Sequence, residues 1–269
     1  MRSPRQRQRV YVAGTRPNMR TLREMLSGSL WSGGLSPQEF DWVAKNAIER
    51  RVAAGGFVAS MGTPADQWIG VIEGLVKMSI TTSDGRAATF TGVTAGGWFG
   101  EGSLLKTGER WRYDSIALRD TRLACIPRRI FSDLLAASLP FNRFVLAHVN
   151  ARLSLFISLA EFDRLLGPDA RVARCLASLF DPDLYPHTES LIQLTQDEVA
   201  LLSAVSRQRA NRALHELEAA GLLQIEFRGI RVLDLPGLRR YAGPKVATLP
   251  NASAAARSSS PESRQIRLG

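Results

Sequence analysis

Short runs of alternating apolar and polar residues, repeatedly interrupted by glycine, fill the stretch from Arg51 to Arg128. Regularly spaced turn signals with brief strands between them are typical of an all-β roll or barrel. The run Trp68–Ile80 predicts two strands that turn near Glu73-Gly74, and Asp84-Gly85 has the composition of a tight hairpin turn. We therefore expect the N-terminal half of the chain to be built mainly from strands.

The hydrophobic period changes after Pro140. Apolar residues then recur at helical spacing as far as Gly167-Pro168, and they cover more than one narrow stripe. A helix this apolar must be buried on two sides: one side can pack on the β-roll, and the other is most simply covered by the same helix of a second subunit. The alternative is a helix buried wholly within one chain. A further helix is expected around Ala170 to Phe180.

Two short helices joined by a tight turn are predicted after residue 194. Thr195 followed by Glu198 forms a capping box, in which the hydroxyl and the carboxylate satisfy opposite backbone donors at a helix start. The first helix then runs to a tight turn at Ala204-Val205, and Ser206 is well suited to cap the second helix. This order of elements predicts a helix-turn-helix.

The second of these helices has two chemically different faces. At 100° per residue, one arc carries only polar side chains, and the opposite arc is apolar. The polar set is Arg207, Gln208, Asn211, Arg212 and His215, and the apolar set is Ala210, Ala213, Leu214, Leu217 and Ala220. Arginine matches guanine and the amides match adenine in the major groove, which a helix-turn-helix enters with the N-terminal end of its second helix. Taken alone, the pattern would also fit an amphipathic helix with a merely solvated polar face.

Beyond Gly221 the sequence alternates again. Leu223, Ile225 and Phe227 are followed by Ile230, Val232 and Leu233 across an Arg-Gly turn. This pattern predicts a hairpin of the wing type. Arg228 and Arg231 fall at its tip, where they could meet the phosphate backbone of DNA.

The formal charge of +10 is unevenly distributed along the chain. Residues 1–20 carry six arginines and no acidic residue, and residues 242–269 carry four basic residues and one acidic residue. Residues 21–241 are therefore near neutral. Both ends lack apolar periodicity, which predicts a disordered basic arm at 1–20 and a disordered tail at 242–269. They serve either as solubilising tails or as nonspecific contacts to phosphate.

The composition, 45% hydrophobic and 22% charged, is that of a soluble globular protein of one or two domains. No apolar stretch approaches the roughly 20 residues that span a bilayer, and the N-terminus lacks a signal-peptide core, so we expect a cytoplasmic protein without membrane contact.

Cys125 and Cys175 have no CxxC spacing and no histidine cluster nearby. They predict buried apolar residues rather than zinc or iron–sulfur ligands.

The sequence resembles the CRP/FNR family, named after the cyclic-AMP receptor protein. The resemblance is carried by Leu194–Ala200, by Ser206–Leu222 and, more loosely, by Gly97–Glu101 in the roll, and it covers about residues 22–241. It implies an α+β protein in three parts. These are a cyclic-nucleotide-binding-like sensory β-roll (double-stranded β-helix) at 21–139, a long dimerisation helix at 140–167 and a C-terminal winged helix-turn-helix at 168–241.

By this resemblance the chain is a bacterial, homodimeric, sequence-specific transcription regulator that binds double-stranded DNA under the control of an effector. If it activates transcription, RNA polymerase is a further partner. Arg207, Gln208 and Arg212 stand at the family's base-reading positions, and Ala204 stands where the family's turn often has glycine. The full candidate DNA-binding set is Thr195, Ser206, Arg207, Gln208, Asn211, Arg212 and Arg228.

The candidate effector-binding residues are Gly100, Glu101, Arg110 and Arg112. In family members that bind cyclic nucleotides, a glutamate of the Phe-Gly-Glu motif accepts a hydrogen bond from ribose, and Glu101 fits that role. The family's phosphate-binding arginine falls at Trp111, which is flanked by the two arginines, and a one-residue slip in the preceding loop would restore an arginine there. The alternative is that Glu101 serves the fold. A cyclic nucleotide, another small molecule and no ligand therefore all stay open. No iron–sulfur cluster or haem is expected, since no cysteine precedes Cys125 and no histidine lies in the roll.

Two other classes of function are alternatives to a DNA-binding transcription regulator. The first is a nucleotide-sensing module that regulates a protein partner without specific DNA binding. The second is an enzyme, but no Ser/His/Asp, Cys/His, phosphate-loop or metal-ligand pattern supports it, so no enzymatic activity is expected.

Overall fold

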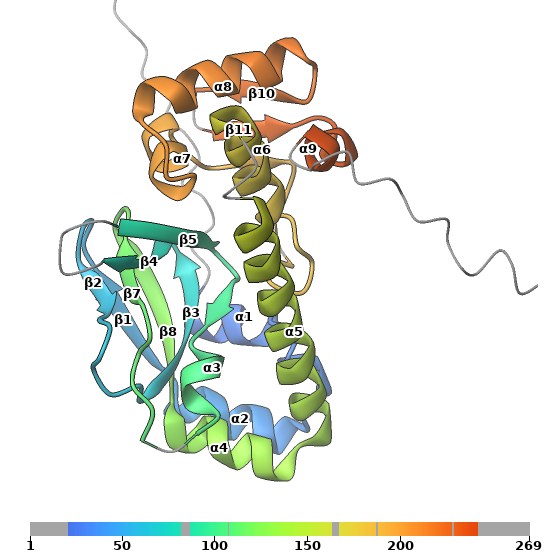
Figure 1. Ribbon diagram of the computed structural model, residues 1–269. Coiled ribbons are helices and arrows are strands. Elements are labelled where there is room, and N and C mark those ends of the chain that lie inside the picture. The colour runs from blue at the N-terminus through green and yellow to red at the C-terminus, as the bar shows by residue number, and fades with distance from the viewer. Residues whose placement is uncertain are drawn as a thin grey trace, which may run out of the picture.

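The computed structural model describes residues 21–81, 87–106, 108–162, 167–186, 188–227 and 229–241 (Figure 1). The arm at 1–20, the tail at 242–269, the Asp84-Gly85 turn and Arg228 lie outside the described residues, so the expectations for them stay predictions.

Strands dominate the chain from Ile48 to Pro127, as their glycine-punctuated sequence predicts. Within the described residues they form two four-stranded antiparallel sheets, of order β1-β8-β3-β6 and β2-β7-β4-β5. The strands are β1 (Ile48–Val52), β2 (Phe57–Ala59), β3 (Gln67–Glu73), β4 (Leu75–Thr81), β5 (Ala87–Thr94), β6 (Trp98–Phe99), β7 (Asp114–Ala117) and β8 (Thr121–Pro127). The predicted turn between β3 and β4 is present: Gly74 has a φ of +112°, a conformation that favours glycine.

Helices flank this roll at its lower end (Figure 1). They are α1 (Leu22–Ser27), the 3-10 turn η1 (Ser32–Gly34), α2 (Pro37–Asn46), the short α3 (Glu101–Leu104) and α4 (Arg128–Ala137). An aromatic cluster joins them to the strands, since Trp31 immediately precedes η1 and Trp68 and Trp98 come from β3 and β6. The Trp68 and Trp98 rings lie 4.3 Å apart between centroids, and Trp31 meets Trp98 edge-on at 5.4 Å.

The long helix α5 spans Leu139–Phe162 and runs along the side of the roll (Figure 1). Its inner side is buried, with Phe141 and Val145 in the core, while Leu146, Leu153 and Ile157 on another side are at least half exposed. Of the described helices, none is by itself long and apolar enough to cross a membrane; α4 and α5 would meet that length and composition only as a pair, and they are bent by 113°.

The C-terminal part consists of helices packed on a small sheet. The elements are α6 (Pro168–Ser178), β9 (Leu191–Ile192), α7 (Gln196–Leu202), α8 (Arg207–Ala219), β10 (Leu223–Glu226), β11 (Gly229–Val232) and α9 (Leu235–Tyr241). Helix α6 packs against α7, α8 and α9, and the strands form an antiparallel sheet of order β10-β11-β9. The predicted α+β architecture of β-roll, long helix and winged helix-turn-helix is confirmed.

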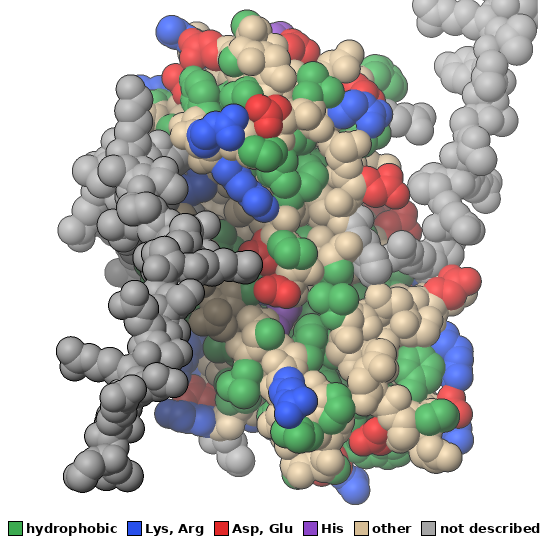
Figure 2. Space-filling view, turned by 90° about the vertical axis from the view of Figure 1, so that its right-hand side faces the viewer, with side chains coloured by type: hydrophobic (Ala, Val, Ile, Leu, Met, Phe, Trp, Pro, Cys, Tyr) green, Lys and Arg blue, Asp and Glu red, His purple; other side chains and the backbone are tan. Residues whose placement is uncertain are grey.

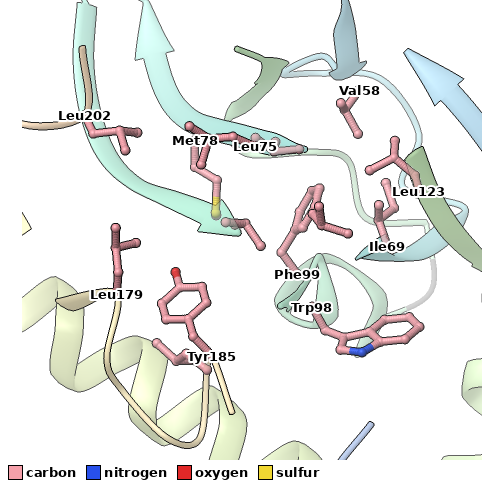
Figure 3. Packing of buried hydrophobic residues seen from close by; sticks show 14 of the residues in the cluster. Val58, Ile69, Leu75, Met78, Trp98, Phe99, Leu123, Leu179, Tyr185 and Leu202 are labelled. Carbon is pink, nitrogen blue, oxygen red and sulfur yellow. The ribbon is translucent and has the colours of Figure 1, made fainter. Parts of the chain in front are cut away.

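The C-terminal part also touches the roll. Figure 3 shows Leu179, Tyr185 and Leu202 on one side of a continuous apolar cluster that includes Leu75 and Met78. The Tyr185 hydroxyl donates to the carbonyl of Gly92 in β5 at 2.7 Å. Arg119, between β7 and β8, donates to the Gln193 carbonyl at 2.6 Å and lies 3.4 Å from a carboxylate oxygen of Glu198. These contacts link the start of α7 to the sensory roll.

Candidate functional site

Helix α7 begins where its sequence predicts. Thr195 is the N-cap, and its backbone N–H donates to the Glu198 carboxylate at 2.8 Å while the Glu198 N–H donates to the Thr195 hydroxyl at 3.2 Å. The helix ends in a Schellman-type turn, because the Val205 N–H donates to the Ala200 carbonyl at 3.1 Å. Ala204 takes up the left-handed conformation of this turn, with φ +52°. The family's glycine position therefore has the backbone that glycine would favour, although alanine occupies it.

Ser206 caps α8, and its hydroxyl accepts from the Arg209 N–H at 3.4 Å. Four of the five residues expected on the packed face are fully buried, namely Ala210, Ala213, Leu214 and Leu217. The prediction for Ala220 is wrong: it lies just past the last helical residue as the C-cap and is exposed. Because the helix ends at Ala219, the angle assigned to Ala220 on a continuous helix no longer applies.

The opposite face of α8 faces solvent over its first two turns. Arg207, Gln208 and Arg212 are exposed. Asn211 is half buried, and its amide donates to the Gln196 side-chain oxygen of α7 at 2.6 Å. The Asn211 amide thus ties the two helices together, a pairing that a single helical wheel does not reveal.

Arg207 and Arg212 already have acidic partners. Arg207 lies 2.8 Å from Asp197 of α7, and Arg212 lies 2.8 Å from Glu216 one turn further along α8. The hydrogen bond from Arg212 lowers the pKa of Glu216 below its ordinary value. Figure 2 shows blue and red side chains intermingled at the upper, C-terminal end of the molecule rather than one continuous basic patch.

The wing is present as the hairpin β10–β11, with Leu223 opposite Val232 and Glu226 opposite Gly229. Glu218 of α8 holds it, since its carboxylate accepts from the Ile225 N–H at 2.8 Å. Phe227 does not continue the inward alternation of Leu223 and Ile225; it belongs to the turn and is 99% exposed. Arg231 is bonded within the wing to Glu226 and to the Ser190 hydroxyl, at 2.5 and 3.2 Å.

A second candidate site lies in the roll, between strands β4 and β5 and helix α5. It is a cavity of about 570 Å³. Its lining is Met78, Ile80, Ala88, Thr89, Phe90, Glu101, Gly102, Ser103, Arg112, Tyr113, Arg152 and Phe156. A cavity of this size and apolar character suits a small molecule.

The effector candidates have different places in the structure. Glu101 and Arg112 line the cavity. Arg110 is not among the lining residues and donates to the Gly62 carbonyl at 2.7 Å. Gly100 caps α3 with φ +100°, and a Cβ there would lie 2.6 Å from the Trp111 ring, so glycine is required for packing. Trp111, at the family's arginine position, is buried in the core.

Sequence reasoning missed the cation closest to Glu101, which is Arg152 of α5. Both side chains are buried, and Arg152 Nε lies 3.6 Å from a Glu101 carboxylate oxygen. Arg152 also donates to the Trp98 carbonyl at 2.8 Å, and His148 Nε2 lies 3.8 Å from the other Glu101 oxygen. The available signal was a charged residue near the middle of a largely apolar helix.

Comparisons with known proteins match both parts of the chain that hold these sites. The family model for the cyclic nucleotide-binding domain matches residues 49–138, and that for the Crp-like helix-turn-helix domain matches residues 170–241. The cyclic AMP receptor protein of Thermus thermophilus is 31% identical over 219 residues, which are 81% of this chain and 98% of that protein. A CRP-like cAMP-activated global transcriptional regulator of Mycobacterium tuberculosis is 25% identical over 78% of this chain and 94% of its own length.

Solved structures agree on the fold. The structure of FixK2 from Bradyrhizobium japonicum has a TM-score of 0.61 at 20% identity and covers 74% of this chain and 98% of that one. A putative transcriptional regulator of the CRP/FNR family from Eubacterium rectale has a TM-score of 0.52 at 19% identity, covering 78% and 96%. The matched domains, their order along the chain and the relative with 31% identity lead to one conclusion: this chain belongs to the CRP/FNR family of transcription regulators.

Proposed function

We propose that this regulator reads DNA with the N-terminal half of α8 inserted in the major groove, and that Arg207, Gln208 and Arg212 make the base contacts. The observation that carries the proposal is the two-sided character of α8: Arg207, Gln208 and Arg212 are exposed, while the other side is anchored in the core by Ala210, Ala213, Leu214 and Leu217. Guanidinium and amide groups on a rigidly held helix are what base-edge recognition requires.

The remaining candidates have supporting roles in this proposal. Thr195 and Ser206 fix the starts of α7 and α8 through their caps, and so set the angle between the two helices. Asn211 holds α8 against Gln196 of α7 and would have to break that bond to reach a base. Arg228, at the wing turn, would reach the phosphate backbone, and its position lies outside the described residues.

The experiment is selection of binding sites from a random DNA pool with the full chain, followed by titration of the enriched site and of random DNA. Arg212→Ala should weaken binding to the enriched site by roughly tenfold or more, since one good arginine–guanine pair discriminates by about that factor. Binding to random DNA should change little. Arg209→Ala is the matched control: Arg209 is exposed on the same helix but lies 60° away from Arg212, next to the packed face.

Equal losses on both kinds of DNA would contradict a base-reading role for Arg212. If no sequence is enriched and a protein partner co-purifies instead, the chain is a sensory module that acts through that partner, and the DNA proposal fails.

We also propose that α5 forms the dimer interface. Leu146, Asn150, Leu153 and Ile157 are all exposed and follow one another at spacings of four, three and four residues. That alternation is the seam of a two-stranded coiled coil, in which a single asparagine fixes the register. Two recognition helices related by a twofold axis would then meet a pseudo-palindromic site.

The dimer is tested by sedimentation velocity of the double variant Leu146→Asp/Leu153→Asp. This variant should be monomeric, because dimerisation would bury two charged side chains from each subunit in the seam. The control is Ser132→Asp, an exposed position on α4 that is not part of the proposed seam. A double variant that stays dimeric would place the interface elsewhere.

We further propose that the protein acts in the bacterial cytoplasm, where its DNA lies, and contacts RNA polymerase if it activates transcription.

A further inference from the structure

The cavity in the roll has an apolar body. Met78 and Ile80 of β4, Phe90 of β5 and Phe156 of α5 are its large apolar lining residues, and the Phe90 and Phe156 rings meet edge-on with 5.6 Å between centroids. Such a lining favours a ligand whose surface is largely apolar, because burial of that surface is what stabilises the complex. A strongly hydrated ligand would lose its water without replacement contacts along these walls.

The charges at the end of the cavity balance each other. Glu101 is 4% exposed and Arg152 6% exposed, and they face each other at 3.6 Å. Each keeps one enclosed atom without a hydrogen bond: Oε2 of Glu101, which lies 3.8 Å from His148 Nε2, and Nε of Arg152, which lies 3.6 Å from the other Glu101 oxygen. Once a small rotation of the two side chains opens these atoms to the cavity, a ligand group that donates to Glu101 Oε2 and accepts from Arg152 Nε satisfies both. A hydroxyl or an amide does this, whereas a phosphate can only accept.

The described lining offers a phosphate poor cationic contacts. Arg152 is already engaged by Glu101, the Trp98 carbonyl and the Tyr185 hydroxyl, so its capture by a ligand anion would leave the Glu101 carboxylate buried without its cation. The other lining cation, Arg112, has a side chain that is 69% exposed and is paired with Glu109 at 3.2 Å.

Tyr113 adds a neutral polar group rather than a charge. Burial, and then the nearby negative charge of Glu101, raise the pKa of Tyr113 well above its ordinary value, so its phenol stays protonated. Trp111, where the family's phosphate-binding arginine falls, packs on Phe99 and Tyr113 in the core.

We propose that this cavity binds an uncharged, mainly apolar small molecule with one hydroxyl or amide head seated between Glu101 and Arg152, and that it does not bind a cyclic nucleotide. The proposal rests on the proposed function, because it names the effector of that regulator. Arg152 and Phe156 both lie on α5, so the ligand contacts the helix that we propose as the dimer interface. Occupancy is thereby coupled to the part of the chain that leads to α6 and the DNA-reading helices.

The test uses the full chain and three probes: 4-butylphenol, butylbenzene, which lacks only the hydroxyl, and cyclic AMP. Binding is measured by isothermal titration calorimetry and by the shift in melting temperature. We expect 4-butylphenol to bind roughly tenfold more tightly than butylbenzene, the factor that one hydrogen bond to a buried charged group supplies. Cyclic AMP should give no heat and no shift. Glu101→Gln should reduce the preference for the hydroxyl.

Ala88→Trp supplies the site control. Ala88 is exposed at the cavity lining, so the indole should fill the cavity without disturbing the core, and phenol binding should be lost. Thr81→Trp is the matched control variant. Thr81 is an exposed β4 residue outside the cavity lining, so this substitution should leave the binding of 4-butylphenol intact.

Three results overturn the proposal: binding of cyclic AMP that Ala88→Trp removes, no binding of either aromatic probe, or probe binding that Ala88→Trp leaves unchanged. The selection of DNA sites is carried out without ligand on the same preparation. A site enriched there, together with any of these three results, would leave the DNA-reading function standing and reject only the ligand class.

Discussion

Replacing Ala204 by glycine should stabilise the protein, which is uncommon for a single substitution. Ala204 sits in the turn between α7 and α8 with φ +52°, and the next residue, Val205, closes the turn by donating to Ala200 at 3.1 Å. A left-handed conformation costs an L-residue about 1–2 kcal/mol, because Cβ crowds the following carbonyl. Glycine avoids that cost.

Glycine also loses more backbone entropy on folding, which offsets about 0.5–1 kcal/mol of the gain. The net expectation for Ala204→Gly is therefore a free energy of unfolding about 0.5–1 kcal/mol higher, measured by urea denaturation. Ala219→Gly is the control, since Ala219 is exposed at the end of α8 and should lose up to about 1 kcal/mol through its lower helix propensity. If Ala204→Gly is neutral or destabilising, the turn is not strained as the backbone indicates.

Two further predictions follow from partly buried groups. Burial raises the pKa of the Cys175 thiol to about 11, so alkylation by iodoacetamide at pH 8 should be roughly a hundredfold slower in the native protein than in urea, and should speed up about tenfold per pH unit. A native rate equal to the unfolded rate would mean that the thiol is open to solvent. Glu218→Ala should leave the Ile225 N–H without its acceptor, destabilise the wing by about 1 kcal/mol and accelerate hydrogen exchange at that amide, while unchanged exchange would exclude the bond.

Features that depend on neighbours in sequence were predictable. The capping box at Thr195 and Glu198, the cap at Ser206 and the turn at Glu73-Gly74 each arise from residues within three positions of one another, so the local pattern determines the local structure. The buried face of α8 was also predictable, because helical periodicity alone decides which residues can reach a core.

Features that depend on contacts between distant segments were not predictable. Arg152 meets Glu101 across 51 positions, and only the packing of α5 on the roll brings them together. The bond between Asn211 and Gln196 likewise depends on the angle between α7 and α8. The prediction that Phe227 continues the inward alternation was wrong for another reason. Alternation holds only while the strand continues, and the chain turns at that residue.

The arginines proposed for base contact raise a physical question, since both are already paired. Arg207 lies 2.8 Å from Asp197, and Arg212 lies 2.8 Å from Glu216, with both arginine side chains more than three-quarters exposed. Exposed pairs are screened by water and salt, so exchanging a carboxylate for a base edge loses little. The carboxylates of Asp197 and Glu216 do, however, cancel most of the positive electrostatic potential that α8 would otherwise present to approaching DNA.

That cancellation favours discrimination between sites. Nonspecific affinity grows with the number of phosphates that a protein neutralises, and residues 21–241 carry almost no net charge. This body should therefore gain little from random DNA, where the arginines can stay with their acids. At a matching site the guanidinium groups exchange those acids for guanine edges, an exchange available only where the sequence is right. The acidic partners thus lower the background affinity more than the specific affinity, and the ratio between the two rises.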